Sequence, residues 1–184
     1  MHPSRSSLVA MSAAAFATVA LAAAPEGGAS SRTEQVPADL SVPSGHEVAF
    51  TLAAEGVQIY ACAQGTAAPG WTLRAPEARL YEEGGRAAGT HYAGPTWESS
   101  DGSKVVGTKV SGATVDADAI PWLLLRAESH AGVGRMGGVT FVQRIRTAGG
   151  VAPDGGCDSE HAGAVAKVPY RAVYRFFRAA AAPG

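Results

Sequence analysis

The sequence predicts an all-β protein, a single-domain antiparallel β-sandwich or barrel with one disulfide. Apolar residues recur with a period of two along most of the chain, whereas a helix would repeat them every 3.6 residues. The apolar runs are short and are separated by turn-forming Gly, Asp and Ser residues. Two cysteines, Cys62 and Cys157, are the third observation. Short strands at turn-punctuated intervals are typical of sandwiches and barrels.

The alternation defines each strand in order. In the first, Val48, Phe50 and Leu52 alternate with smaller or polar residues, as a half-buried strand requires. In the last, residues 170, 172, 174 and 176 are Tyr, Ala, Tyr and Phe on one face, with Arg171 and Arg175 on the other. The expected strands are 48–52, 57–62, 71–73, 78–81, 86–92, 104–110, 120–129, 138–147 and 169–178, and residues 159–167 are the one stretch that could form a short helix.

A glycine-rich segment, Gly132-Val-Gly-Arg-Met-Gly137, matches the dinucleotide-binding fingerprint letter for letter. That fingerprint needs a helix directly after the loop, so that helix amides can hold the pyrophosphate. Here Val139, Thr140, Phe141 and Val142 follow, which is a strand signature. We therefore expect a hairpin loop between two core strands.

The first 24 residues have the organisation of a cleaved signal peptide. Arg5 precedes an uncharged, alanine-rich run from Leu8 to Ala24, which ends in small residues. A membrane anchor is the weaker interpretation, because the run is short and only mildly apolar. The sequence predicts a secreted or periplasmic protein, with a signal peptide at 1–24, a flexible lead-in at 25–43, a β domain at 44–178 and a tail at 179–184.

Composition restricts the partners. The net charge is −1, and removal of the leader takes away only Arg5. A near-neutral chain offers no concentrated basic surface for nucleic acid, and no polybasic patch for anionic membranes. We expect no nucleic-acid partner, no membrane span after processing and no cofactor; the oligomeric state stays open.

The cysteines have three possible roles. In an exported protein a lone pair most simply forms one disulfide, here Cys62–Cys157. A metal site and a reactive thiol are the alternatives, although only His161 stands at zinc-like spacing from Cys157.

Candidate ligand-binding residues concentrate between two expected strands. His91, Tyr92, Trp97 and Glu98 lie close together in sequence, and His130 ends another strand. Trp97 could stack on a sugar ring or another flat face, with histidine and carboxylate groups hydrogen bonding beside it. The alternative is that Trp97 fills the core. A binding module for a small-molecule or cell-envelope ligand is therefore the first hypothesis.

A metal-assisted or carboxylate-based hydrolase using His91, Glu98 and His130 is the second hypothesis. No local spacing demands a metal, so no metal ligands are predicted, and no nucleophile elbow is present. Two glutamines on apolar strands, Gln58 and Gln143, could mark a polar spot inside the domain. The strand arginines Arg144, Arg146, Arg171 and Arg175 could suggest an acidic ligand, but we expect them on solvent faces, where such arginines usually only increase solubility.

Several blocks together resemble a known family: Val42-Pro-Ser-Gly-His46, Gly56-Val-Gln-Ile-Tyr-Ala-Cys62, His91-Tyr-Ala-Gly-Pro-Thr-Trp-Glu98, Ile120-Pro-Trp-Leu-Leu-Leu125 and Gly155-Gly-Cys157. They are similar to the exported domain of unknown function 3455 of bacteria and fungi. The resemblance covers roughly residues 42–178. It implies a secreted domain of unestablished activity.

Overall fold

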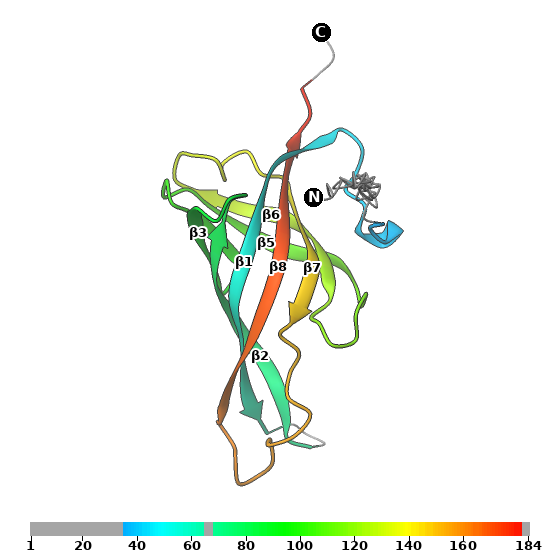
Figure 1. Ribbon diagram of the computed structural model, residues 1–184, viewed down its shortest axis with the longest axis vertical. Helices are drawn as coiled ribbons and strands as arrows, with labels where there is room; N and C mark the ends of the chain where they lie inside the picture. Colours follow the sequence, from blue (N-terminus) through cyan, green and yellow to red (C-terminus); the bar gives the residue numbers. More distant parts are fainter. Residues whose placement is uncertain (1–34, 65–67, 182–184) are drawn as a thin grey trace, which may run out of the picture. The chain divides into compact units, whose positions relative to one another are not determined.

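The computed structural model describes residues 35–64 and 68–181 and consists almost entirely of β-strands. Eight antiparallel strands follow one another around a closed barrel, and β1 pairs with both β2 and β8 to close the ring (Figure 1). The predicted all-β fold is confirmed, and of its two forms the chain adopts the barrel. After a short 3-10 helix, η1 (Ala38–Leu40), the strands are β1 (His46–Ala63), β2 (Gly70–Tyr81), β3 (Ala87–Tyr92), β4 (Thr96–Ser99), β5 (Lys104–Ala113), β6 (Trp122–Ala131), β7 (Phe141–Gly149) and β8 (Val165–Ala179).

Three elements differ from the sequence-based expectation. The first four expected runs are two long strands, because β1 continues through Gly56 and β2 through residues 74–77. A Cβ at Gly56 would lie 2.1 Å from the Glu77 carbonyl oxygen, so this glycine lets the two strands approach and does not end either one. The segment around Trp97, expected as a loop, is the short strand β4. Residues 159–167 form a turn followed by the start of β8, with no helix.

The barrel interior holds the main core. On β8 the predicted inward face is confirmed, since Tyr170, Ala172, Tyr174 and Phe176 are all buried. Trp97 on β4 is only 1% exposed and belongs to the same core, which confirms the core-filling alternative for this side chain.

The glycine-rich segment is the loop between β6 and β7, as expected, and it covers the upper end of the barrel in Figure 1. Its Met136 is completely buried in the main core. The Asp101 carboxylate accepts hydrogen bonds from the backbone N–H groups of Ser103 (2.9 Å) and Arg135 (3.0 Å). A Cβ at Gly134 would lie 2.5 Å from the Asp101 carboxyl carbon, so only glycine fits where the loop passes this carboxylate.

A second, smaller core lies on the outer face of the wall. Leu40 from η1 is fully buried against Trp122, Leu124 and Ile145 of β6 and β7. The Gln143 amide donates a hydrogen bond of 2.8 Å to the Leu40 carbonyl oxygen. The composition of residues 35–43 predicts part of a flexible lead-in. In the structure this segment is attached to the barrel, because its apolar side chains Val36, Leu40 and Val42 pack on the apolar outer surface of β6 and β7.

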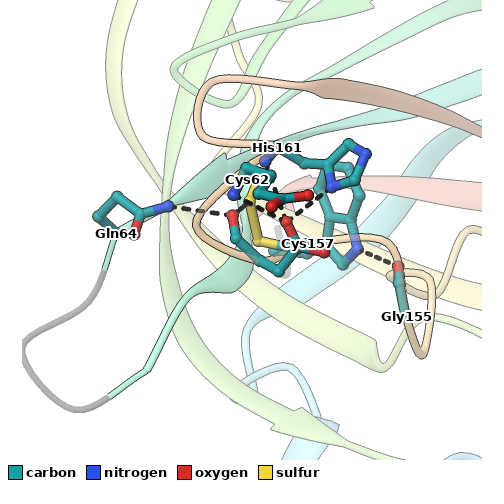
Figure 2. Close-up of polar contacts among 8 residues, drawn as sticks. Cys62, Gln64, Gly155, Cys157 and His161 are labelled. Atoms are coloured by element: carbon teal, nitrogen blue, oxygen red, sulfur yellow. Dashed lines mark hydrogen bonds and ion pairs between the residues drawn. A yellow bond between two sulfur atoms is a disulfide. The ribbon is translucent and has the colours of Figure 1, made fainter.

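The lower end in Figure 1 carries the disulfide. Cys62 at the end of β1 is bonded to Cys157 in the β7–β8 connection, 95 residues away, as predicted (Figure 2). The indole N–H of Trp71 donates a hydrogen bond of 2.8 Å to the Gly155 carbonyl oxygen in the same connection. Here β2, β1 and β8 extend beyond the other strands as a three-stranded ribbon. The disulfide fits a protein that matures in an oxidising compartment.

The predicted signal peptide, the first part of the lead-in and the last residues of the tail lie outside the described residues. Among the described residues, no helix is long and apolar enough to cross a bilayer.

Candidate ligand cavity

A cavity of about 260 Å³ lies inside the barrel, between the wall formed by β1 and β2 and the wall formed by β6, β7 and β8. It opens beside Leu73, whose side chain is half exposed. The volume is slightly below the range of about 300–1,000 Å³ that is usual for small-molecule sites, so a ligand must be small. The lining residues are Gln58, Leu73, Arg74, Ala75, Pro76, His91, Ala93, Gly94, Pro95, Trp97, Leu123, Leu125, Arg144 and Tyr174.

Three rings packed against one another, those of His91, Trp97 and Tyr174, form one wall of this cavity. His91 and Trp97 are directly paired across β3 and β4, and their rings stack with centroids 4.5 Å apart and planes 10° apart. Tyr174 meets both rings edge-on, at 5.1 Å from His91 and 5.3 Å from Trp97. Because each ring is held by the other two, this wall is rigid.

His91 is uncharged in the folded protein. Its side chain is 2% exposed, and this burial lowers its pKa from 6.5 to about 3. Nδ1 lies 2.8 Å from the Thr96 carbonyl oxygen, which can only accept, so we assign the ring proton to Nδ1. Nε2 then carries a lone pair. A histidine with this pKa is a poor general base near neutral pH.

Two buried donors on residues that line the cavity have no hydrogen-bond partner among the described residues. They are the amide nitrogen Nε2 of Gln58 and the indole nitrogen Nε1 of Trp97, on side chains that are each 1% exposed. The hydroxyls of Tyr170 and Tyr174 also lack a partner at bonding geometry, although both interact electrostatically with Arg144. Burial raises the pKa of both tyrosines, so both stay protonated.

Arg144 is a partly exposed residue that brings a positive charge to the cavity. On β7 it pairs with Tyr174 on one side and Leu123 on the other, and all three side chains line the cavity. Its Nε and Nη2 donate hydrogen bonds of 3.0 and 2.8 Å to the Pro121 carbonyl oxygen. Among the described residues no carboxylate forms an ion pair with it.

The structure divides the sequence-predicted residues between two faces of the wall. His91 and Trp97 line the cavity, whereas Tyr92 and Glu98, their immediate neighbours in sequence, are half-exposed and do not. The Tyr92 hydroxyl donates to the Glu98 carboxylate at 2.8 Å, and Lys104 forms an ion pair with it at 3.1 Å. These bonds lower the pKa of Glu98, the Tyr92 bond most.

His130 lies apart from both groups. Its Nε2 is 2.7 Å from the Val139 carbonyl oxygen, so it holds the β6–β7 loop, and it is not among the lining residues. In the described part of the chain, no group of three His, Cys, Asp or Glu side chains is placed to hold a metal ion.

Sequence reasoning missed Arg144 and Tyr174 as site residues. Both are on strands whose alternation is visible, but the sequence does not say which face of β7 points inward. Gln58 did give a signal, because a glutamine on an apolar strand needs a polar environment. Gln143 gave the same signal and lies on the outer wall, bonded to Leu40.

The fold and cavity define the chain as an antiparallel barrel of eight consecutive strands with a small, partly polar interior site. A family profile described as "Protein of unknown function (DUF3455)" matches residues 43–178, and the chain belongs to this family. No curated protein matches the chain. No solved structure matches it either.

Proposed function

We propose that the protein binds a small molecule inside the barrel, in the cavity walled by His91, Trp97 and Tyr174. The observation that carries this proposal is the pair of unpartnered donors, Gln58 Nε2 and Trp97 Nε1, on two side chains that line the cavity. Eight-stranded barrels have an interior that either fills with side chains or holds one small ligand.

Energetics support binding at this place. A buried donor without a partner costs about 1–3 kcal/mol, and an acceptor on a ligand would recover that cost. The rigid ring wall adds apolar contact at no cost in side-chain ordering, since the rings are already fixed.

Binding is better supported than hydrolysis. His91 is uncharged with a pKa of about 3, Glu98 does not line the cavity, and His130 binds the β6–β7 loop. A general acid–base pair needs both groups within reach of one substrate, and these three side chains do not share a cavity.

The test uses the tryptophans as reporters. The chain has three, of which only Trp97 lines the cavity. In a Trp71→Phe, Trp122→Phe variant, Trp97 is the sole indole, and a library of small organic molecules is screened by its emission and by thermal shift. We expect hits that change Trp97 emission saturably and raise the melting temperature. A library of broad chemistry without such a hit would contradict the proposal.

A blocking variant separates cavity binding from surface binding. Leu123→Trp fills the cavity from β6, and Leu73→Trp fills its mouth at a half-exposed position that tolerates a larger side chain. Val110→Trp, at an exposed position that does not line the cavity, is the matched control. We expect each blocking variant to abolish binding of the hits and the control to keep it; equal binding by all three would place the ligand elsewhere.

The cellular location belongs to the same proposal. We infer export through cleavage of residues 1–24, followed by formation of the disulfide, and a secreted or periplasmic site of action. The intact mass of protein recovered from the exported fraction should begin at Pro25 and contain no free thiol. A full-length chain in the cytosol would contradict this inference.

A further inference from the structure

The charges around the cavity are all of one sign. Its lining contains two arginines, Arg74 and Arg144, and neither Asp nor Glu is among the lining residues. His91 adds no positive charge, because it is uncharged at neutral pH. The two arginines would therefore repel a cationic ligand, whereas an anion would find positive charge without a carboxylate partner.

Arg144 is oriented before any ligand arrives. Two of its nitrogens, Nε and Nη2, donate to the Pro121 carbonyl oxygen, which restrains the orientation of the guanidinium plane. Its other partner, the Tyr174 hydroxyl, is neutral and leaves the positive charge uncompensated. Its charge acts within the barrel. Burial is the largest cause of the lowered pKa of His91, and the Arg144 charge lowers it further. Burial raises the pKa of Tyr170 and Tyr174, and the Arg144 charge opposes this rise. A guanidinium that is held by neutral partners, and that has no carboxylate partner among the described residues, is well suited to bind a carboxylate.

The two unpartnered donors favour a ligand with acceptors. Gln58 Nε2 and Trp97 Nε1 can only donate, and both are on side chains from other walls than Arg144. The space between them is bounded by the Trp97 and Tyr174 rings and by Leu123 and Leu125. An apolar body with an acid group at one end fits this distribution of charge and apolar surface.

We infer that the ligand is a small monocarboxylate with an apolar body, its carboxylate paired with Arg144 and its body against the Trp97 ring wall. This inference rests on the proposed function and specifies the chemical class of its ligand.

The experiment compares acids with matched neutral molecules. trans-Cinnamate is titrated against cinnamyl alcohol, and octanoate against octanol, using Trp97 emission in the Trp71→Phe, Trp122→Phe protein near pH 7.5. We expect at least one acid to bind about tenfold more tightly than its alcohol, as a charge-assisted hydrogen bond contributes that much. Arg144→Gln should remove this preference, and Arg144→Lys should retain part of it.

The control is Arg171→Gln, which removes an exposed arginine that pairs with Glu55 and does not line the cavity. It should leave the preference unchanged. If Arg144→Gln does not fold, the comparison of acids with alcohols in the unsubstituted cavity still decides.

Each other outcome overturns the inference in a recognisable way. If alcohols bind as tightly as acids, or if Arg144→Gln keeps the preference, the ligand class is wrong while cavity binding stands. If neither pair binds but neutral or basic library compounds do, the ligand class is again wrong while cavity binding stands. If nothing binds, both the inference and the proposed function fail.

Discussion

His91 illustrates how burial decides the chemistry of one side chain. In sequence it stands in a polar block, where a charged or catalytic histidine would be unremarkable. In the barrel it stacks on Trp97, donates to the Thr96 carbonyl oxygen and is removed from water, so the neutral form is strongly favoured.

This environment gives a pH dependence of known sign. Below about pH 6.5 the unfolded chain binds a proton at His91 that the folded chain does not, because the folded pKa is about 3. The free energy of unfolding should therefore fall by up to about 1.4 kcal/mol per pH unit between about pH 6.5 and 3 through this residue. Urea unfolding at several pH values should show a shallower acid loss in His91→Gln than in the unchanged protein. Equal slopes for His91→Gln and the unchanged protein would contradict the assignment.

At the scale of elements, the segment before β1 shows what composition hides. Val36, Leu40 and Val42 are separated by polar or small residues and by prolines, which is the composition of a linker. Their apolar side chains nonetheless cover Trp122, Leu124 and Ile145, which would otherwise leave an apolar patch on the outer wall. The short helix η1 is the means by which Leu40 reaches that patch.

Leu40 should therefore contribute strongly to stability. Leu40→Ala should lower the free energy of unfolding by about 2–5 kcal/mol, because a fully buried leucine is replaced by a cavity. The measurement is urea unfolding followed by circular dichroism. Asp39→Ala, which changes an exposed neighbouring side chain, is the matched control and should change stability far less. Similar losses in the two variants would mean that η1 does not anchor the lead-in.

At the scale of the whole molecule, the alternation of apolar residues predicted the β class and the inward face of β8, because a period of two is a local property. Closure into a barrel depends on the pairing of β1 with β8, which are far apart in sequence, and no local sequence pattern predicts that pairing. The cavity was also hidden, since Arg144 resembles a solvent-facing strand residue until its cross-strand partner Tyr174 is known.

The disulfide acts at this same scale, because it joins the end of β1 to the β7–β8 connection and encloses most of the domain. Cys62→Ala with Cys157→Ala should lower the free energy of unfolding by about 2–5 kcal/mol, chiefly by freeing the unfolded chain. Reductant should lower the urea midpoint of the unchanged protein and leave that of the double variant unaltered. A midpoint that does not respond to reductant in the unchanged protein would contradict this prediction.

The barrel wall is not closed at the three-stranded ribbon of β2, β1 and β8, and this leaves one edge of β2 without a neighbouring strand. Between Gly70 and Glu77, β2 has hydrogen-bonded register with β1 alone, so its other side is a free strand edge. Pro76 has no N–H to offer along that edge, and Arg74 and Glu77 place charges beside it. These residues disfavour pairing of a second copy with this edge of β2, and so act against edge-to-edge aggregation there.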